Sequence, residues 1–260
     1  MSLLQVENDE IKERVYGFLS QTRYACSELT PLSGGSANFV FRGVLRVPVS
    51  SSASEEKVEV VIVKYSAAFL FVARAFSIDL SRCVSDPFFL STQFQADAIQ
   101  TAEASMLRAL HNTTTNLPFR TPQLYLFDKV ENIQVHQYFA AAANLEQIFA
   151  SQTLSPAVAE RISYDIGVAL WSFHKWASHS AQTGLGAEIW KNEPMRRLKY
   201  RTSYASLVGM LENFPGLIEG CRGQFEDLTA MAAGEFNRVA ADTNGDANWG
   251  VIHGDFWAGK

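Results

Sequence analysis

Asp255 is the residue of this sequence best placed to act as a base. It follows a short apolar run, residues 249–252, and lies in a turn with His253 and Gly254. An apolar run bounded by turn residues predicts a short buried strand, so the turn lies at the rim of a core. A carboxylate at such a rim can accept a proton from an incoming hydroxyl. The alternative, that His253 and Asp255 only satisfy backbone groups of the turn, stays open.

Lys64 is predicted to point along an apolar surface. Residues 58–65 are rich in β-branched side chains, which predicts a strand. Side chains alternate between the two faces of a strand, so Lys64 shares its face with Val60 and Ile62. The alternative is a lysine at the strand end whose ammonium reaches water.

Glu103 is the predicted partner of Lys64. Residues 95–111 predict a helix, and Glu103 falls inside its apolar stripe, which consists of Ile99, Met106, Leu107 and Leu110. A buried carboxylate needs a partner or it becomes neutral. Because Lys64 also points inward from a nearby element, we expect the two charges to pair. A glutamate that simply reaches solvent is the alternative.

A glycine-bearing turn precedes both charges. Its residues are Gly34, Gly35, Ser36, Ala37 and Asn38, and an apolar strand follows at residues 39–42. Backbone N–H groups of such a turn can approach phosphate oxygens closely. The pattern has neither the Gly-Lys-Ser/Thr ending of a P-loop nor a following helix. By itself it is therefore a weak phosphate signal.

The remaining histidines and the cysteines suggest no further chemistry. We predict that the histidines lie at the surface or cap helices; they are His111, His136, His174 and His179. The three cysteines are far apart in sequence and form neither a disulfide framework nor a metal-ligand spacing; they are Cys26, Cys83 and Cys221. We expect no metal site and a reducing, cytoplasmic environment.

Composition is that of an ordinary globular protein. Of 260 residues, 47% are hydrophobic and 19% charged, and the net charge is −5. An acidic balance without dense basic runs argues against a nucleic-acid or anionic-membrane partner. The most apolar zone, residues 58–76, carries Glu59, Lys64 and Arg74, which disfavours a membrane span.

The chain divides into a strand-rich and a helix-rich half near residue 140. In the first half we predict, in addition to the elements above, a helix at residues 9–20 and strands at residues 121–127 and 133–139. In the second half we predict helices at residues 145–150, 158–177, 194–211 and 225–239. Residues 66–94 hold six phenylalanines and give no confident element.

The order of these features resembles the aminoglycoside phosphotransferase and choline kinase group of small-molecule kinases. Residues 253–259, which read His-Gly-Asp-Phe-Trp-Ala-Gly, resemble the catalytic loop of that group and are the most specific match. Residues 32–42 are similar to its nucleotide loop and second strand, and residues 61–65 to its lysine strand. Residues 103–107 resemble its pairing-glutamate helix, and residues 165–174 its long helix beneath the catalytic loop.

The resemblance implies an α+β protein with a two-lobe protein kinase-like fold. The β-rich, nucleotide-binding lobe would span residues 1–139, and a helical lobe ending at the catalytic loop would span residues 140–260. ATP would lie in the cleft, covered by the turn at residues 34–38 and contacted by Lys64, which Glu103 holds. Asp255 would deprotonate a hydroxyl of a small-molecule acceptor. The acceptor and the oligomeric state are left open.

Two Mg²⁺ ligands of the group have no counterpart in this sequence. Its asparagine five residues after the aspartate corresponds to Lys260, whose ammonium would repel a cation. Its second ligand, an aspartate, would come after Lys260. We therefore expect the 260-residue chain to be inactive as given. Three explanations stay open: a fragment or wrongly ended gene prediction, a natural truncation, and a non-catalytic nucleotide-binding protein (a pseudokinase) on the same fold.

Overall fold

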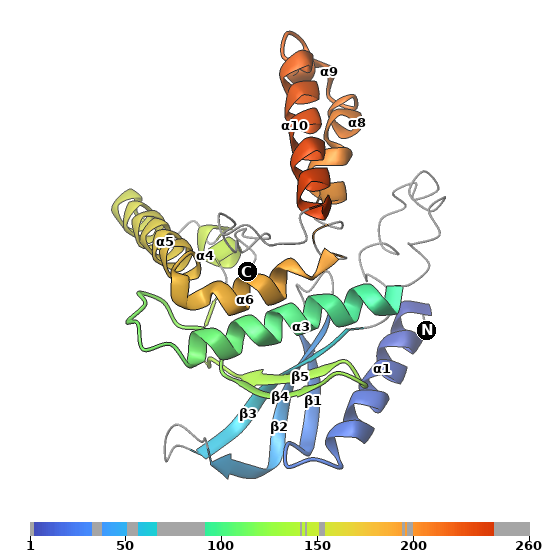
Figure 1. Ribbon diagram of the computed structural model, residues 1–260. Helices are drawn as coiled ribbons and strands as arrows, with labels where there is room; N and C mark the ends of the chain where they lie inside the picture. Colours follow the sequence, from blue (N-terminus) through green and yellow to red (C-terminus); the bar gives the residue numbers. More distant parts are fainter. Residues whose placement is uncertain are drawn as a thin grey trace. The chain divides into compact units, whose positions relative to one another are not determined.

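The computed structural model describes nine stretches of the chain: residues 3–32, 38–50, 57–66, 92–140, 142–143, 145–150, 154–193, 196 and 200–241. The chain splits into two compact units (Figure 1). The first runs through Ala159 and the second begins at Glu160, so the division falls inside one helix. The two lobes predicted from the sequence, with their boundary near residue 140, stay a prediction.

A five-stranded antiparallel sheet forms the centre of the first unit. Its strands are β1 (Cys26–Leu32), β2 (Phe39–Ser50), β3 (Lys57–Tyr65), β4 (Leu124–Asp128) and β5 (Ile133–Gln137). Their spatial order is β1-β2-β3-β5-β4, and every neighbouring pair is antiparallel. The central place of β3 agrees with its β-branched sequence, which packs well on a pleated surface. The mixed α+β class is confirmed.

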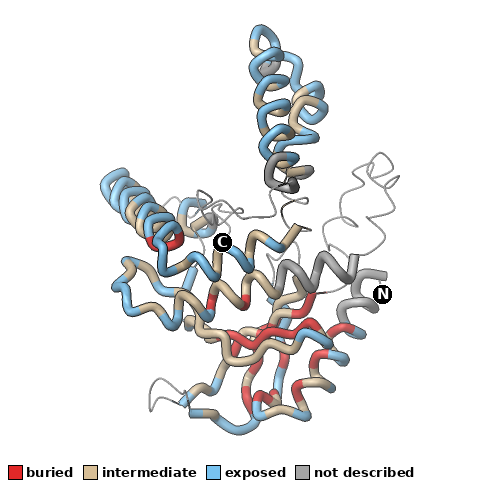
Figure 2. The backbone as a smooth tube through the Cα atoms, in the orientation of Figure 1, coloured by how far each residue is buried: buried red, intermediate tan, exposed pale blue. Residues whose placement is uncertain are grey.

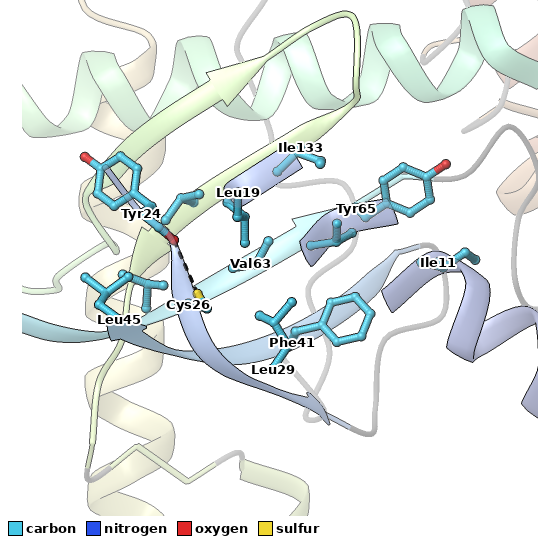
Figure 3. Close-up of a cluster of buried hydrophobic side chains, with 13 residues drawn as sticks. Ile11, Leu19, Tyr24, Cys26, Leu29, Phe41, Leu45, Val63, Tyr65 and Ile133 are labelled. Carbon is cyan, nitrogen blue, oxygen red and sulfur yellow. Dashed lines mark hydrogen bonds between the residues drawn. The ribbon is translucent and has the colours of Figure 1, made fainter. Parts of the chain in front are cut away.

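One face of the sheet carries the apolar core. Helix α1 (Leu3–Leu19) presents Ile11, Val15 and Leu19 at intervals of four residues, the spacing of one helix face. They pack with Tyr24, in the turn before β1, and with the strand residues Cys26, Leu29, Phe41, Leu45, Val61, Val63, Tyr65, Ile133 and Val135 (Figure 3). Buried residues are concentrated in this layer (Figure 2). Burial of this apolar surface is the main stabilising contribution visible in the first unit.

Gly43 on β2 is required by the packing of this core. A Cβ atom at this position would lie 2.7 Å from the Cys26 Sγ and 3.2 Å from a methyl carbon of Val61. Strands β1 and β3 therefore pack against β2 at a point where no side chain fits.

Helix α3 (Thr92–His111) lies along the other face of the sheet (Figure 1). Its Ala104 and Leu107 side chains are buried. Because side chains alternate between the faces of β3, and Val61, Val63 and Tyr65 belong to the α1 core, Val60, Ile62 and Lys64 point to the side of α3.

The second unit is helical in its described part. Helix α4 (Leu145–Ala150) precedes this unit, and α5 (Pro156–Ala177) crosses the boundary between the two units. The elements that follow are η3 (Ser180–Gln182), α6 (Thr183–Trp190), η4 (Arg201–Ala205, a π-helix), α8 (Leu207–Leu211), α9 (Pro215–Ile218) and α10 (Arg222–Ala241). The Tyr200 and Phe236 rings stack with centroids 4.8 Å apart, which ties α10 to the start of η4.

Several elements differ from the sequence predictions. Strand β1 and helix α6 were not predicted, and α1 begins six residues before the predicted start. The single helix predicted at residues 194–211 is wrong in part, because η4 and α8 are separated at Ser206. None of the helices in the described part of the chain combines the length and the apolar character that crossing a membrane demands.

Candidate functional site

Lys64 lies near the end of β3, on the face that α3 covers. The strand register places it directly opposite Val40 of β2 and Gln134 of β5. Residues opposite one another in antiparallel strands share a face, so these three side chains form one row across the sheet. About a fifth of the Lys64 side chain is exposed (21%).

Glu103 lies on α3 and forms an ion pair with Lys64. The Lys64 Nζ donates to the Glu103 Oε1 across the layer between sheet and helix. The pairing that the sequence predicted is therefore confirmed. With 33% of its side chain exposed, Glu103 is half-buried and not enclosed, so both charges can be reached from solvent. An ammonium carries three N–H donors, so a lysine held by one carboxylate can also bind an anionic oxygen.

The surface around the ion pair is more polar than predicted. Lys64 does share its face with Val60 and Ile62, but β5 contributes Gln134 and His136 to the same layer. Gln134 is fully buried, and His136 is 3% exposed. The prediction that His136 lies at the surface or caps a helix is wrong, because β5 is an inner strand and α3 covers this face. For His179 the capping prediction is confirmed, since its Nδ1 accepts from the Ala181 backbone N–H at 3.2 Å.

His136 is held in its neutral form. Burial lowers the pKa of His136 from 6.5 to about 4, with the Lys64 cation acting in the same direction and the Glu103 carboxylate opposing. Its Nε2 lies 2.7 Å from the Gln134 Oε1. An amide oxygen only accepts, so the imidazole N–H that donates is on Nε2. Ion pair and neutral polar pair therefore lie side by side beneath α3.

Asn38 is fixed at the edge of this layer by Ser66. The Ser66 Oγ donates to the Asn38 Oδ1, which joins the start of β2 to the end of β3. The Ser66 backbone N–H donates to the Asn132 carbonyl at 3.1 Å. Asn132 has a φ of 55°, in the left-handed region that asparagine tolerates better than most residues. Asn38 is thus held close to the strand that carries Lys64.

The other predicted site residues cannot be placed. Gly34, Gly35, Ser36, Ala37 and Asp255 lie outside the described residues, as does most of the phenylalanine-rich segment at residues 66–94. The structure therefore brings together Lys64 and Glu103, and holds Asn38 at the strand end. Their contact with a nucleotide stays a prediction.

A separate recess lies beside the far end of α3. Its volume is about 350 Å³, and it is lined by Leu110, His111, Thr113, Thr115, Asn116, Leu117, Phe119, Arg120, Thr121, Gln137 and Phe139. The Arg120 guanidinium lies 5.5 Å from the centre of the Phe139 ring at its border. Lys64 and Glu103 do not line this recess, so it is distinct from the layer that holds the ion pair.

Comparison with known proteins supports a class of function. No known family profile matches the sequence. Over its whole length the chain is 25% identical to phosphotransferase FrzJ from a Cladobotryum species, across 263 aligned positions. The chain spans about 65% of the length of that relative. The α+β structure, with its antiparallel sheet and its lysine–glutamate ion pair, is compatible with a kinase-like protein. The sequence similarity suggests a phosphotransferase family.

Proposed function

We propose that this chain belongs to a protein that transfers the γ-phosphoryl group of ATP to a hydroxyl of a small molecule. The proposed fold is a two-lobe protein kinase-like one, in which residues 1–139 would form the nucleotide-binding lobe. The observation that carries the proposal is the Lys64–Glu103 ion pair, half-buried between β3 and α3. The similarity to a phosphotransferase, over the whole of this chain and 65% of that relative, adds independent support.

Lys64 is the group proposed to contact the nucleotide phosphates. Adjacent phosphate groups of a nucleotide carry closely spaced negative charges, and an ammonium held in place neutralises part of this charge. The Glu103 carboxylate keeps the lysine in one orientation, which lowers the entropy cost of binding. Asn38, held by Ser66, directly precedes β2 and is the last residue of the turn predicted at residues 34–38. Backbone N–H groups of that turn would donate to the same phosphates.

Asp255 is the proposed base. The acceptor hydroxyl oxygen attacks the γ-phosphorus, a new P–O bond forms, and the bond from the γ-phosphorus to the bridging oxygen breaks. ADP leaves with the electron pair of that bond, and the hydroxyl proton passes to the Asp255 carboxylate. Catalysis in such transfers rests on positioning and on charge neutralisation more than on covalent chemistry of the protein.

Mg²⁺ is the metal that the family resemblance implies, and it would neutralise phosphate charge when bound. Within the described ranges no three His, Cys, Asp or Glu side chains gather as a metal-ligand cluster. Lys260 stands where the resemblance places an asparagine ligand. The residues at hand do not fit this metal, and no step is assigned to it.

The acceptor class and the cellular setting are also proposals. A small-molecule hydroxyl, such as that of an amino alcohol or a sugar, is the acceptor expected from the family resemblance. We propose a cytoplasmic protein without nucleic-acid or membrane partners, in line with its net charge of −5.

Calorimetric titration of the chain with ATP tests the nucleotide site. We expect saturable binding that Lys64→Met weakens roughly tenfold to a hundredfold, the range for a charge-assisted hydrogen bond to an anion. Lys57→Met is the matched control, because Lys57 is an exposed lysine on the same strand, and it should leave affinity unchanged. Absence of binding, or equal binding by both variants, would overturn the proposal.

Transfer is tested separately with ATP labelled in its γ-phosphate, Mg²⁺ and a panel of amino alcohols and sugars. Transfer to one acceptor that is lost in Asp255→Asn would support the phosphotransferase and would overturn the expectation that the 260-residue chain is inactive as given. ATP binding without transfer is the result expected of this chain, and the rival function, a non-catalytic nucleotide-binding protein on the same fold, predicts the same result.

A further inference from the structure

Two polar side chains are buried in a place where the fold does not need them. On β5, Ile133 and Val135 point into the α1 core, while Gln134 and His136 point towards α3. All four are buried. A strand buried on both faces is ordinarily apolar throughout, because a buried polar group gains little over an apolar one even when it is hydrogen-bonded. If only packing mattered at positions 134 and 136, leucine or valine would be sufficient there.

Both polar side chains are neighbours of the ion pair. Gln134 is directly opposite Lys64 in the β3–β5 register, and His136 is opposite Ile62, one step along the same face. Directly opposite residues in antiparallel strands have Cβ atoms about 5 Å apart. The long Lys64 side chain therefore passes Gln134 on its way to Glu103.

The two side chains form a neutral hydrogen-bonded unit. The His136 Nε2 donates to the Gln134 Oε1 at 2.7 Å, which fixes the orientation of both groups. The charged groups that face this unit are Lys64 from β3, Glu103 from α3 and Arg42 from β2, whose guanidinium lies over the Tyr138 ring. Strand β4 contributes Leu124 and Phe127 to these rows, neither of them charged.

We propose that Gln134 and His136 are positioning residues that hold Lys64 in the orientation required for binding a nucleotide phosphate. Fixed dipoles can confine the lysine without neutralising it. A cation at position 136 would repel Lys64, and a carboxylate at position 134 would compete with Glu103 and with the phosphate. The role in nucleotide binding rests on the proposed function, whereas the effect on Lys64 itself does not.

Amine acylation followed by mass spectrometry measures the effect on Lys64 directly, without nucleotide. The acylation rate of Lys64 is compared with the rates of the exposed Lys57 and Lys129 in each variant. We expect Gln134→Leu and His136→Leu to raise the relative acylation rate of Lys64 roughly three- to tenfold. This is the range for loss of one hydrogen bond, here the bond between His136 and Gln134 that either variant removes. His136→Gln keeps a neutral N–H donor and should stay within about twofold of the wild-type rate.

Val135→Ala is the matched control for loss of stability. Val135 lies between the two positions on the same strand, but it points into the α1 core. This variant loses packing and should leave the relative acylation rate of Lys64 unchanged. The positioning role is overturned if Gln134→Leu and His136→Leu give the same relative acylation rate of Lys64 as Val135→Ala. It is also overturned if His136→Gln raises that rate as much as His136→Leu does.

Repeating the acylation with saturating ATP separates this inference from the proposed function. Protection of Lys64 by ATP in the wild type, weakened in Gln134→Leu and His136→Leu but kept in Val135→Ala, would support both. Without protection by ATP in any variant, the role in nucleotide binding is overturned, and the rates without ATP still decide whether Gln134 and His136 position the lysine.

Discussion

The two faces of the sheet in the first unit differ in chemistry although the same strands build both. Towards α1 the strands present aliphatic and aromatic side chains around Cys26. Towards α3 they present Lys64, Gln134 and His136, with Glu103 opposite. Burial of the apolar face stabilises the fold. The polar face stabilises it less than an apolar layer at the same positions would. Polar groups kept at that cost point to binding or catalysis.

Each face buries a titratable group whose pKa is shifted so that the group stays neutral. Burial raises the pKa of the Cys26 thiol to about 11, with Arg46 opposing, and the Sγ donates to the Tyr24 carbonyl at 3.3 Å. Cys26 therefore behaves as a small packing residue. His136 is neutral for the same main reason, but it also feels the two charges of the ion pair. Cys26 thus feels the single cation of Arg46, whereas His136 feels both charges of the Lys64–Glu103 ion pair.

The largest expected effect is on the apolar face. Leu19→Ala removes a fully buried side chain from the α1 core and should lower the free energy of unfolding by about 2–5 kcal/mol in urea titrations. Val47→Ala, at a position that is 70% exposed, should change it by less than about 0.5 kcal/mol. A loss below about 1 kcal/mol for Leu19→Ala would mean that this face is not the main source of stability.

The second effect comes from His136 and depends on pH. The unfolded chain binds a proton near pH 6.5, whereas the folded chain binds it only near pH 4. The unfolding free energy should therefore fall as the pH is lowered through this window, by roughly 3 kcal/mol from this residue. Urea titrations at several pH values would show a shallower dependence for His136→Leu than for the wild type.

A third effect separates function from stability on the polar face. Glu103→Gln removes the carboxylate that holds Lys64, so ATP affinity should fall roughly three- to tenfold in calorimetric titrations. The ion pair is partly exposed, so the free energy of unfolding should change by less than about 1 kcal/mol. Glu59→Gln, at an exposed position of β3, is the control. Equal affinities of both variants would speak against a role of Glu103 in orienting the lysine.

The smallest effect is expected where α1 meets the β4–β5 turn. Arg14 forms an ion pair with Glu131 at 3.0 Å, with side-chain exposures of 55% and 35%. Exposed pairs of this kind contribute little and are screened by salt. Arg14→Ala should therefore lower the unfolding free energy by less than about 1 kcal/mol at low salt, and by less still at 1 M salt. A larger loss that persists at high salt would indicate that Arg14 acts mainly by packing on the Tyr65 ring, 5.7 Å away.

The sequence was sufficient to predict the ion pair of the site but not the buried polar pair beside it. Alternation along β3 and the helix stripe of α3 predicted that Lys64 and Glu103 point at each other, because both patterns are local. The alternation of Ile133, Gln134, Val135 and His136 is typical of a strand with one solvated face. Here that second face is buried by α3, which is a tertiary arrangement that the local pattern does not contain. His136 was misassigned for this reason.

The edge of the sheet was missed for a different reason. Strand β1 contains Ser27, Glu28, Thr30 and Pro31, and only Cys26 and Leu29 of its residues are buried. Proline and charged residues are tolerated at a sheet edge, where one side of the strand makes no ladder. Such a strand lacks the β-branched run that identified β3. Its pairing with β2 supplies the structure that its own sequence signals weakly.

The most direct measurement uses ATP that carries a reactive acyl group on its terminal phosphate, which transfers the acyl group to an amine within reach. Mass spectrometry of the treated chain should find Lys64 acylated, with excess ATP suppressing the reaction and exposed Lys57 left unmodified. Lys64 left unmodified, or modified equally with and without competing ATP, would contradict the account that the polar face of the sheet binds a nucleotide.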